Sequence, residues 1–177
     1  MTTETYAGYA PDESRPPLLA YATFAAVFHA AMAGAVAMAK RSGRDLPHRV
    51  EAGDVALIGT ASYQLSRLVS KKKITAFVRA PFTELEGKSG PAEVEEKPRG
   101  SGLRRTLGEL LVCPYCLGLW ASGGFHAGLL FAPRATRFSA SVLTAMALAD
   151  FLQVAYRAAE ERGLQRGEPG PRTGTGG

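Results

Sequence analysis

The two cysteines of the chain, Cys113 and Cys116, stand in the order Cys-Pro-Tyr-Cys and carry its clearest potential for chemistry. Pro114 fits the first position of a helix, where no backbone N–H is needed, so the pattern predicts a helix with Cys113 as its N-cap. A helix N-terminus stabilises an anion. We therefore expect Cys113 to be the more acidic and more reactive of the two thiols.

Three roles stay open for this pair. Dithiol–disulfide exchange uses the Cys-x-x-Cys spacing, and Cys-Pro-Tyr-Cys is the glutaredoxin motif, although the chain offers neither the strand nor the sheet that surrounds it there. A metal site at Cys113 and Cys116 would need two more ligands, from His48 or a second subunit. No cofactor is therefore predicted, and zinc or iron would require an intersubunit site. In the third role the thiols only pack the start of a helix.

Three further ionisable side chains fall inside apolar stretches: His29, His126 and Asp150. Ionisable groups inside a membrane are costly and often mark routes for protons or ligands. We expect each histidine to be neutral and hydrogen-bonded to a neighbouring helix. Asp150 is the third candidate catalytic residue beside the cysteines, because its position in the last stretch predicts a depth in the membrane close to that of Cys116.

These residues lie in or beside long apolar stretches. Residues 16–39 and 110–133 contain no formal charge, and residues 138–156 contain only Asp150. Each is long enough for the roughly 20 helical residues that cross a bilayer core, and apolar side chains cover all helix faces instead of one stripe. Residues 54–69 are interrupted by Gln64 and Arg67. The sequence predicts an all-α integral membrane bundle of three to four helices, with the second helix short or interfacial; the alternative is a soluble bundle of buried helices.

The distribution of Lys and Arg orients this bundle. Three spans with the N-terminus outside place 18 of the 21 basic residues on the cytoplasmic side, whereas four spans with the N-terminus inside place 15 there. The positive-inside rule favours three spans. Both arrangements describe a multi-pass cell-membrane protein with the loop at about residues 70–107 and the C-terminus in the cytoplasm.

The chain is expected to divide into a polar N-terminal segment at residues 1–15, a membrane helical domain at 16–158 and a disordered tail at 159–177. In the loop, residues 74–82 are apolar enough to lie against the membrane, and residues 83–101 predict a mobile surface loop. Lys71, Lys72 and Lys73 are candidates for contact with anionic lipids. The basic residues flank apolar stretches, so the net charge of +5 predicts no nucleic-acid partner.

Several runs of sequence resemble one uncharacterised bacterial membrane-protein family. They are RAPFTELEG at 79–87, PAEVEEKPRGSGLRRTLGELLVCPYCLGLW at 91–120, APRATR at 132–137 and ADFLQ at 149–153. The family is the domain of unknown function numbered thirteen-sixty, one branch of which is described as a sporulation protein, and the resemblance covers about residues 52–156. It implies a membrane protein without an assigned reaction. Its implied signature here is Arg67, Arg79, Pro81, Phe82, Glu109, Cys113, Pro114, Cys116 and Trp120.

No complete catalytic constellation is visible in the sequence, which holds no Ser/His/Asp set, phosphate-binding loop or full set of metal ligands. The sequence therefore favours a non-enzymatic membrane subunit or scaffold of unknown biochemical function, with a cytoplasm-facing Cys-Pro-Tyr-Cys motif. Such a protein is expected to bind a protein partner or a second copy of itself. The alternatives are a membrane thiol–disulfide oxidoreductase that uses Cys113 and Cys116, or a metal-linked membrane assembly.

Overall fold

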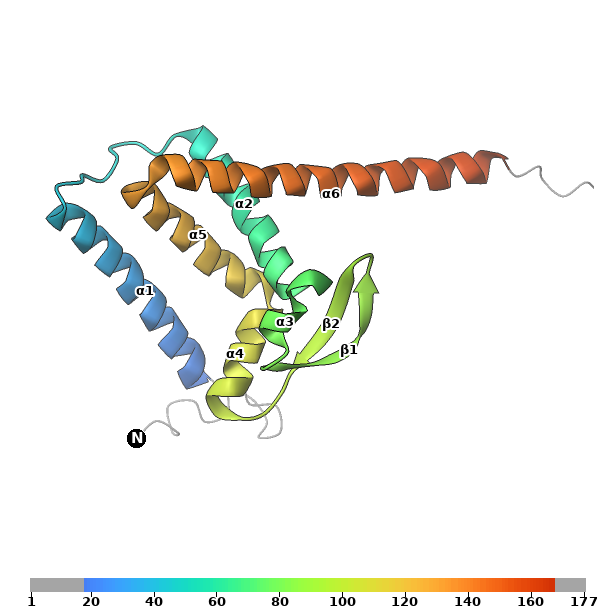
Figure 1. Ribbon diagram of the computed structural model, residues 1–177, viewed down its shortest axis with the longest axis horizontal. Coiled ribbons are helices and arrows are strands. Elements are labelled where there is room, and N and C mark those ends of the chain that lie inside the picture. Colours follow the sequence, from blue (N-terminus) through green and yellow to red (C-terminus); the bar gives the residue numbers. More distant parts are fainter. Residues whose placement is uncertain (1–17, 168–177) are drawn as a thin grey trace, which may run out of the picture.

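The computed structural model describes residues 18–167, which form six α-helices, one 3₁₀ turn and a β-hairpin (Figure 1). The predicted N-terminal segment at residues 1–15 and the end of the predicted tail, residues 168–177, lie outside this range. In chain order the elements are α1 (Leu18–Arg41), α2 (Ala52–Ser70), η2 (Lys73–Thr75), α3 (Ala76–Arg79), β1 (Thr83–Gly90), β2 (Glu93–Pro98), α4 (Gly102–Val112), α5 (Pro114–Phe131) and α6 (Pro133–Gly167).

The protein is mostly helical, as predicted, but it also contains a small two-stranded sheet that an all-α fold does not include. Strands β1 and β2 pair antiparallel where a mobile loop was predicted, with Thr83 opposite Pro98. Glu, Lys and Gly have low strand propensity, so nothing local indicates strands. The hairpin is instead anchored to the end of α2, because the N–H of Val94 donates to the carbonyl oxygen of Lys71 (3.0 Å) and that of Lys73 to the carbonyl oxygen of Ala92 (2.9 Å).

Within the described residues, α1 and α6 are each long and apolar enough to cross a membrane. Helices α4 and α5 pass the same test only as a pair, bent by 82°. The predicted stretch at 110–133 therefore contains a bend, and α6 continues to Gly167, into the segment predicted as disordered tail. Large apolar side chains such as Val27, Phe138 and Leu148 are exposed on these helices. Exposed apolar area on this scale is typical of a surface that contacts lipid or another protein.

Helix α2 packs against both α5 and α6, and α1 packs against α5 (Figure 1). Helices α1 and α5 run in the same direction. Near their starts, the Tyr21 hydroxyl donates to the carboxylate of Glu109, which lies in the last turn of α4, just before α5 (3.0 Å). At their other ends, the guanidinium carbon of Arg44, just after α1, lies 5.7 Å from the centre of the ring of Phe131, the last residue of α5.

Helix α2 runs in the opposite direction to α1 and α5. Asp54 in its first turn forms an ion pair with Arg137, which follows the end of α5 (2.7 Å). The end of α2 lies beside the start of α5, where a Cβ atom on Gly118 would be 3.9 Å from the Ser66 hydroxyl. Two glycines allow close packing elsewhere. A Cβ atom on Gly123 would lie 2.6 Å from the Phe28 ring of α1, and one on Gly108 would lie 2.5 Å from the carbonyl oxygen of Phe82.

Candidate functional site

The cysteine pair sits at the bend between α4 and α5. As predicted, Cys113 is the N-cap of α5 and Pro114 occupies its first turn, while the Cys113 sulfur accepts a hydrogen bond from the Cys116 N–H (3.1 Å). The two cysteines form a disulfide, with their Cα atoms 5.3 Å apart, inside the usual range for such bonds. Cys116 is exposed and Cys113 is half-buried. One helical turn therefore holds both sulfurs together where a reaction partner can approach.

A cavity of about 360 Å³ lies beside the pair, between the starts of α1 and α5 and the end of α4. Cys113 and Cys116 contribute to its wall, and most of the remaining wall is apolar, including Phe24, Leu119 and Trp120. The Trp120 ring is fixed by an edge-to-face contact with Phe28, with ring centres 5.4 Å apart. This cavity, called the cysteine cavity below, places aromatic side chains next to a disulfide.

Glu109 supplies a polar group in the cysteine cavity. Its carboxylate accepts the hydrogen bond from the Tyr21 hydroxyl (3.0 Å) and lies 3.2 Å from the Arg105 guanidinium. Four residues of the implied family signature, Glu109, Cys113, Cys116 and Trp120, thus meet around one cavity. Sequence reasoning placed them in one run, but it did not identify Tyr21 or Phe24, which come from a helix about 90 residues away.

Asp150 belongs to a different region. It accepts a hydrogen bond from Gln64 (3.1 Å) and forms an ion pair with Lys72 (3.3 Å). Lys72 also lies 3.5 Å from Glu93, which forms a 2.6 Å ion pair with Arg67. These five residues are called the acid–base cluster, and they line a second cavity of about 300 Å³ that does not include the cysteines. Asp150 and Cys116 therefore line different cavities, and the predicted similarity of their depths in the membrane stays a prediction.

The acid–base cluster joins α2, the hairpin and α6 electrostatically. Gln64 is only 1% exposed, so its amide could not find another partner in water. Burial raises the pKa of the Glu93 carboxyl, but the hydrogen bond and positive charge of Arg67, with help from Lys72, outweigh it and leave the pKa below its usual range. Glu93 therefore stays ionised at neutral pH. The positive charges of Arg67 and Lys72 compensate the negative charges of Glu93 and Asp150, and the cluster holds no obvious reactive group.

The predicted lipid-contacting lysines are mostly engaged inside the protein. Lys71 forms an ion pair with Glu95 (2.9 Å), and Lys72 is part of the acid–base cluster. Lys73 is exposed and is followed by two highly exposed apolar side chains, Ile74 and Phe77. Of the three lysines, Lys73 alone has an arrangement suited to a membrane surface.

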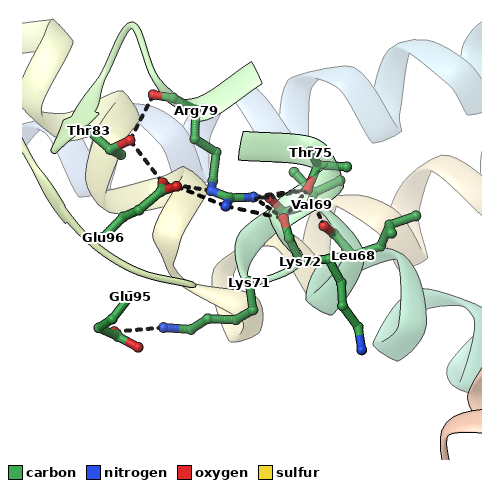
Figure 2. Close-up of polar contacts among 9 residues, drawn as sticks. All are labelled: Leu68, Val69, Lys71, Lys72, Thr75, Arg79, Thr83, Glu95 and Glu96. Atoms are coloured by element: carbon green, nitrogen blue, oxygen red, sulfur yellow. Dashed lines mark hydrogen bonds and ion pairs between the residues drawn. The ribbon is translucent and has the colours of Figure 1, made fainter. Parts of the chain in front are cut away.

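Arg79 is the centre of a buried clamp between α2 and the hairpin (Figure 2). It is fully buried and makes two hydrogen bonds to the Glu96 carboxylate, of 2.8 Å and 3.0 Å. Its guanidinium also donates to the Thr75 hydroxyl (3.0 Å) and to the carbonyl oxygens of Val69 and Lys72. Carbonyl groups at a helix C-terminus lack partners within the helix. The Arg79 cation supplies partners there and matches the helix dipole.

The Glu96 carboxylate, at the other end of the clamp, also has hydrogen-bond partners. The Thr83 hydroxyl donates to the carboxylate at 2.9 Å, and only 6% of the Glu96 side chain is exposed. Burial raises its pKa, but the hydrogen bonds from Arg79 and Thr83 and the charge of Arg79 lower it further, so the pKa lies below its usual range. Arg79 was singled out from the sequence only by resemblance. Its partner Glu96 was missed, because one glutamate among several in a polar segment carries no distinguishing signal.

The remaining signature residues support these elements. The carbonyl oxygen of Pro81 accepts two hydrogen bonds from Arg104 (2.9 Å and 2.6 Å), and that of Phe82 accepts one from the N–H of Arg99 (3.0 Å). Helix α3 stops at Arg79, two residues before Pro81. The bonds from Arg104 hold α4 against the segment before the hairpin, and the bond from Arg99 closes the base of the hairpin.

The two histidines of the apolar stretches form hydrogen bonds within their own helices. The Nδ1 atom of His29 lies 2.7 Å from the carbonyl oxygen of Ala25, and that of His126 lies 2.8 Å from the carbonyl oxygen of Ser122. The predicted bonds to a neighbouring helix are therefore wrong. Among residues 18–167, no group of three or more His, Cys, Asp or Glu side chains is placed to hold a metal ion.

The fold and its sites define a mostly helical protein with two membrane-length apolar helices, a clamped hairpin and a helix-capping cysteine pair. The chain belongs to the family described as "Protein of unknown function (DUF1360)", whose model matches residues 57–156. This range contains the whole acid–base cluster, the clamp and both cysteines.

Two relatives come from Bacillus subtilis (strain 168). "Sporulation protein YjcA" is 29% identical over 102 residues, which cover 56% of this chain and 86% of the relative. "UPF0713 protein YngL" is 32% identical over 77 residues, which cover 42% of this chain and 55% of the relative. No solved structure matches the chain significantly.

Proposed function

We propose that the chain is an integral membrane protein in which α1, α2, α5 and α6 all cross the bilayer. The direction of the helices supports this. Because α1 and α5 run parallel, the chain between them must return across the same thickness, and α2 is the helix that runs back. Its polar side chains Ser62, Gln64 and Ser66 are buried in the protein and thus sheltered from lipid, which is how polar groups are tolerated in membrane helices.

Four crossings place the hairpin, α4 and both chain ends on one face, which carries 15 of the 21 Lys and Arg residues. We assign this face to the cytoplasm by the positive-inside rule. Alkaline phosphatase, which is active only outside the cytoplasm, tests the arrangement when fused after residue 47 and, separately, after residue 89. Activity at 47 and inactivity at 89 are expected. An inactive fusion at 47 would support the three-span arrangement instead.

The activity that the geometry supports best is reversible dithiol–disulfide exchange by Cys113 and Cys116. The observation that carries this proposal is the capped turn, in which the Cys113 sulfur accepts the Cys116 N–H while both sulfurs border an open cavity. The same N–H and the N-terminus of α5 would stabilise a Cys113 thiolate after reduction. Cys116 can then close the disulfide without movement of the helix.

Thiol trapping in intact cells tests the exchange. The Cys113–Cys116 pair should shift between reduced and oxidised forms when cells are treated with a reductant and then with diamide. Cys116→Ser should lock the protein in a form with one accessible thiol. Cys113→Ser is the matched variant, because serine retains an N-cap acceptor for α5 while it removes the second thiol. A pair that stays in one state under both treatments contradicts the proposal.

A non-enzymatic membrane subunit is the second candidate, and the clamped hairpin favours it. The buried Arg79–Glu96 pair holds β1 and β2 as a defined projection. Among residues 18–167 the outer edge of β1 pairs with no other strand, so it offers backbone groups to a partner strand. A photo-crosslinking residue at Leu85, which is exposed, should capture a discrete partner in native membranes. The same residue at exposed Lys88 is a second position on this edge, and no product at either would contradict this role.

We further propose that Lys73, Ile74 and Phe77 contact the membrane surface, with the lysine beside anionic headgroups and the apolar side chains inserted among them. The side chains of Ile74 and Phe77 are each 76% exposed, which is unfavourable in water. Phosphatidylglycerol should stabilise the purified protein against heating, and Lys73→Gln should reduce that gain. An equal gain in Lys73→Gln and in the unaltered protein would contradict the contact.

A further inference from the structure

The cysteine cavity has a size and an apolar lining that exchange with a soluble thiol does not require. Its volume of about 360 Å³ is at the lower end of the range for small-molecule sites. Apolar and aromatic side chains, among them Phe24, Leu119 and Trp120, form most of the wall. A flat ring compound fits such a wall better than a charged thiol tripeptide or a peptide chain.

The position of the cavity indicates where its ligand comes from. Tyr21, Phe24 and Ala25 belong to the first turns of α1, an apolar helix of membrane length, and Leu119 is a half-exposed apolar residue of α5. The cavity therefore lies at the level where the proposed membrane core begins, beside helix surfaces that face lipid. A ligand that dissolves in the bilayer reaches the sulfurs without crossing water.

The chemistry of the wall restricts the ligand further. Closing a dithiol to a disulfide requires an acceptor of two electrons and two protons. Tyr21 and Glu109 form a hydrogen-bonded pair at the cavity, and a ring carbonyl oxygen would replace Glu109 as the acceptor of the single Tyr21 hydroxyl hydrogen. We propose that the cysteine cavity binds the ring of a lipid-soluble quinone, which oxidises the reduced Cys113–Cys116 pair. This inference rests on the dithiol–disulfide exchange proposed above.

The reaction balances with the quinone as the named oxidant. The Cys113 thiolate attacks a ring carbon and forms a carbon–sulfur bond. The Cys116 thiolate then attacks the Cys113 sulfur, so the sulfur–sulfur bond forms and the carbon–sulfur bond breaks, leaving both electrons on the ring. The two protons of the original thiols end on the two ring oxygens. The products are one disulfide and one hydroquinone.

Purified protein in mild detergent tests the inference. The protein is reduced with dithiothreitol, desalted and mixed with decylubiquinone, and both quinone absorbance and free thiols are followed. One quinone should be reduced and two thiols lost per chain. Ala25→Phe should slow this reaction at least tenfold, because the added ring fills the cavity. Tyr115→Phe is the control, since the Tyr115 side chain is exposed and does not line the cavity.

Diamide separates the ways in which the experiment can fail. Ala25→Phe should still be oxidised by diamide at the normal rate, which shows that its thiols and fold are intact. If diamide oxidises the unaltered protein but decylubiquinone does not, the quinone inference is wrong and the exchange proposal stands. If neither oxidises the pair, both are wrong. If Ala25→Phe reacts with quinone as fast as the unaltered protein, the cavity is not the site.

Discussion

Replacement of Arg79 by methionine removes the cation and donors of the buried clamp while it keeps much of the side-chain length. The Glu96 carboxylate, only 6% exposed, then loses both hydrogen bonds to the guanidinium and its compensating charge. Removal of one partner of a buried ion pair costs about 3–5 kcal/mol, because the other charge is left without compensation. We expect a loss of this size in the free energy that holds the hairpin to α2.

Hydrogen exchange measures this loss locally. The N–H groups of Val94 and Lys73 donate to the carbonyl oxygens of Lys71 and Ala92, at 3.0 Å and 2.9 Å, and both bonds break when the hairpin detaches from the end of α2. Since about 1.4 kcal/mol corresponds to a factor of ten, Arg79→Met should accelerate exchange at these amides roughly a hundredfold to several thousandfold, up to the limit set by global unfolding.

Lys97→Met is the matched control, because Lys97 is exposed and its ion pairs with Glu84 and Glu86 are 3.9 Å and 3.5 Å long. Such surface pairs contribute about 1 kcal/mol at most. The double variant Arg79→Met/Glu96→Leu removes the stranded charge and should recover part of the protection. Exchange in Arg79→Met that is no faster than in Lys97→Met would refute the role of the clamp.

Three further outcomes are expected. The Glu96 pKa in the folded protein is below its ordinary value of 4.5, so the stabilisation of the fold by the Glu96 carboxylate is complete above pH 4.5 and is lost as the pH falls through the lower folded pKa. Amide exchange in the hairpin, corrected for intrinsic rates, should therefore become faster in this window. Glu96→Gln should make this increase smaller. Gly123→Ala should destabilise the protein in detergent by about 1–3 kcal/mol, because the added methyl group would collide with α1. Gly124→Ala should not, because the space around Gly124 is open. Equal melting temperatures of the two variants would contradict this. Gly108→Ala should loosen the contact between α4 and the hairpin and make proteolysis there faster. Gly59→Ala should be neutral or slightly stabilising, because alanine favours helix. An unchanged rate of proteolysis in Gly108→Ala would contradict the contact.

The local features of the cysteine turn could be predicted from sequence. Pro114 cannot occupy a helix interior without loss of a hydrogen bond, so it marked the first turn of α5 and made Cys113 its cap. The long uncharged stretches predicted α1 and the apolar part of α6 for the same reason, because hydropathy and length depend only on consecutive residues.

The clamp could not be predicted in this way. Arg79 and Glu96 are 17 residues apart in the sequence, and they contact each other only when the hairpin folds back onto the end of α2. Residues 83–98 have the composition of a surface loop, and their strand pairing is stabilised by contacts to Lys71 and Lys73. Asp150 was recognised as costly in an apolar helix, but its partners Gln64 and Lys72 come from distant segments.

The sequence by itself determined the helix-capping cysteine pair, the apolar helices and the family of the chain, because each depends on neighbouring residues along the chain. The tertiary structure decided that α1 and α5 run parallel, that the charged residues of α2, α6 and the hairpin compensate one another, and that an aromatic cavity borders the disulfide. These features depend on packing and electrostatics between segments up to about 90 residues apart. Close packing and low exposure turn such contacts into large energies, and no local pattern encodes them.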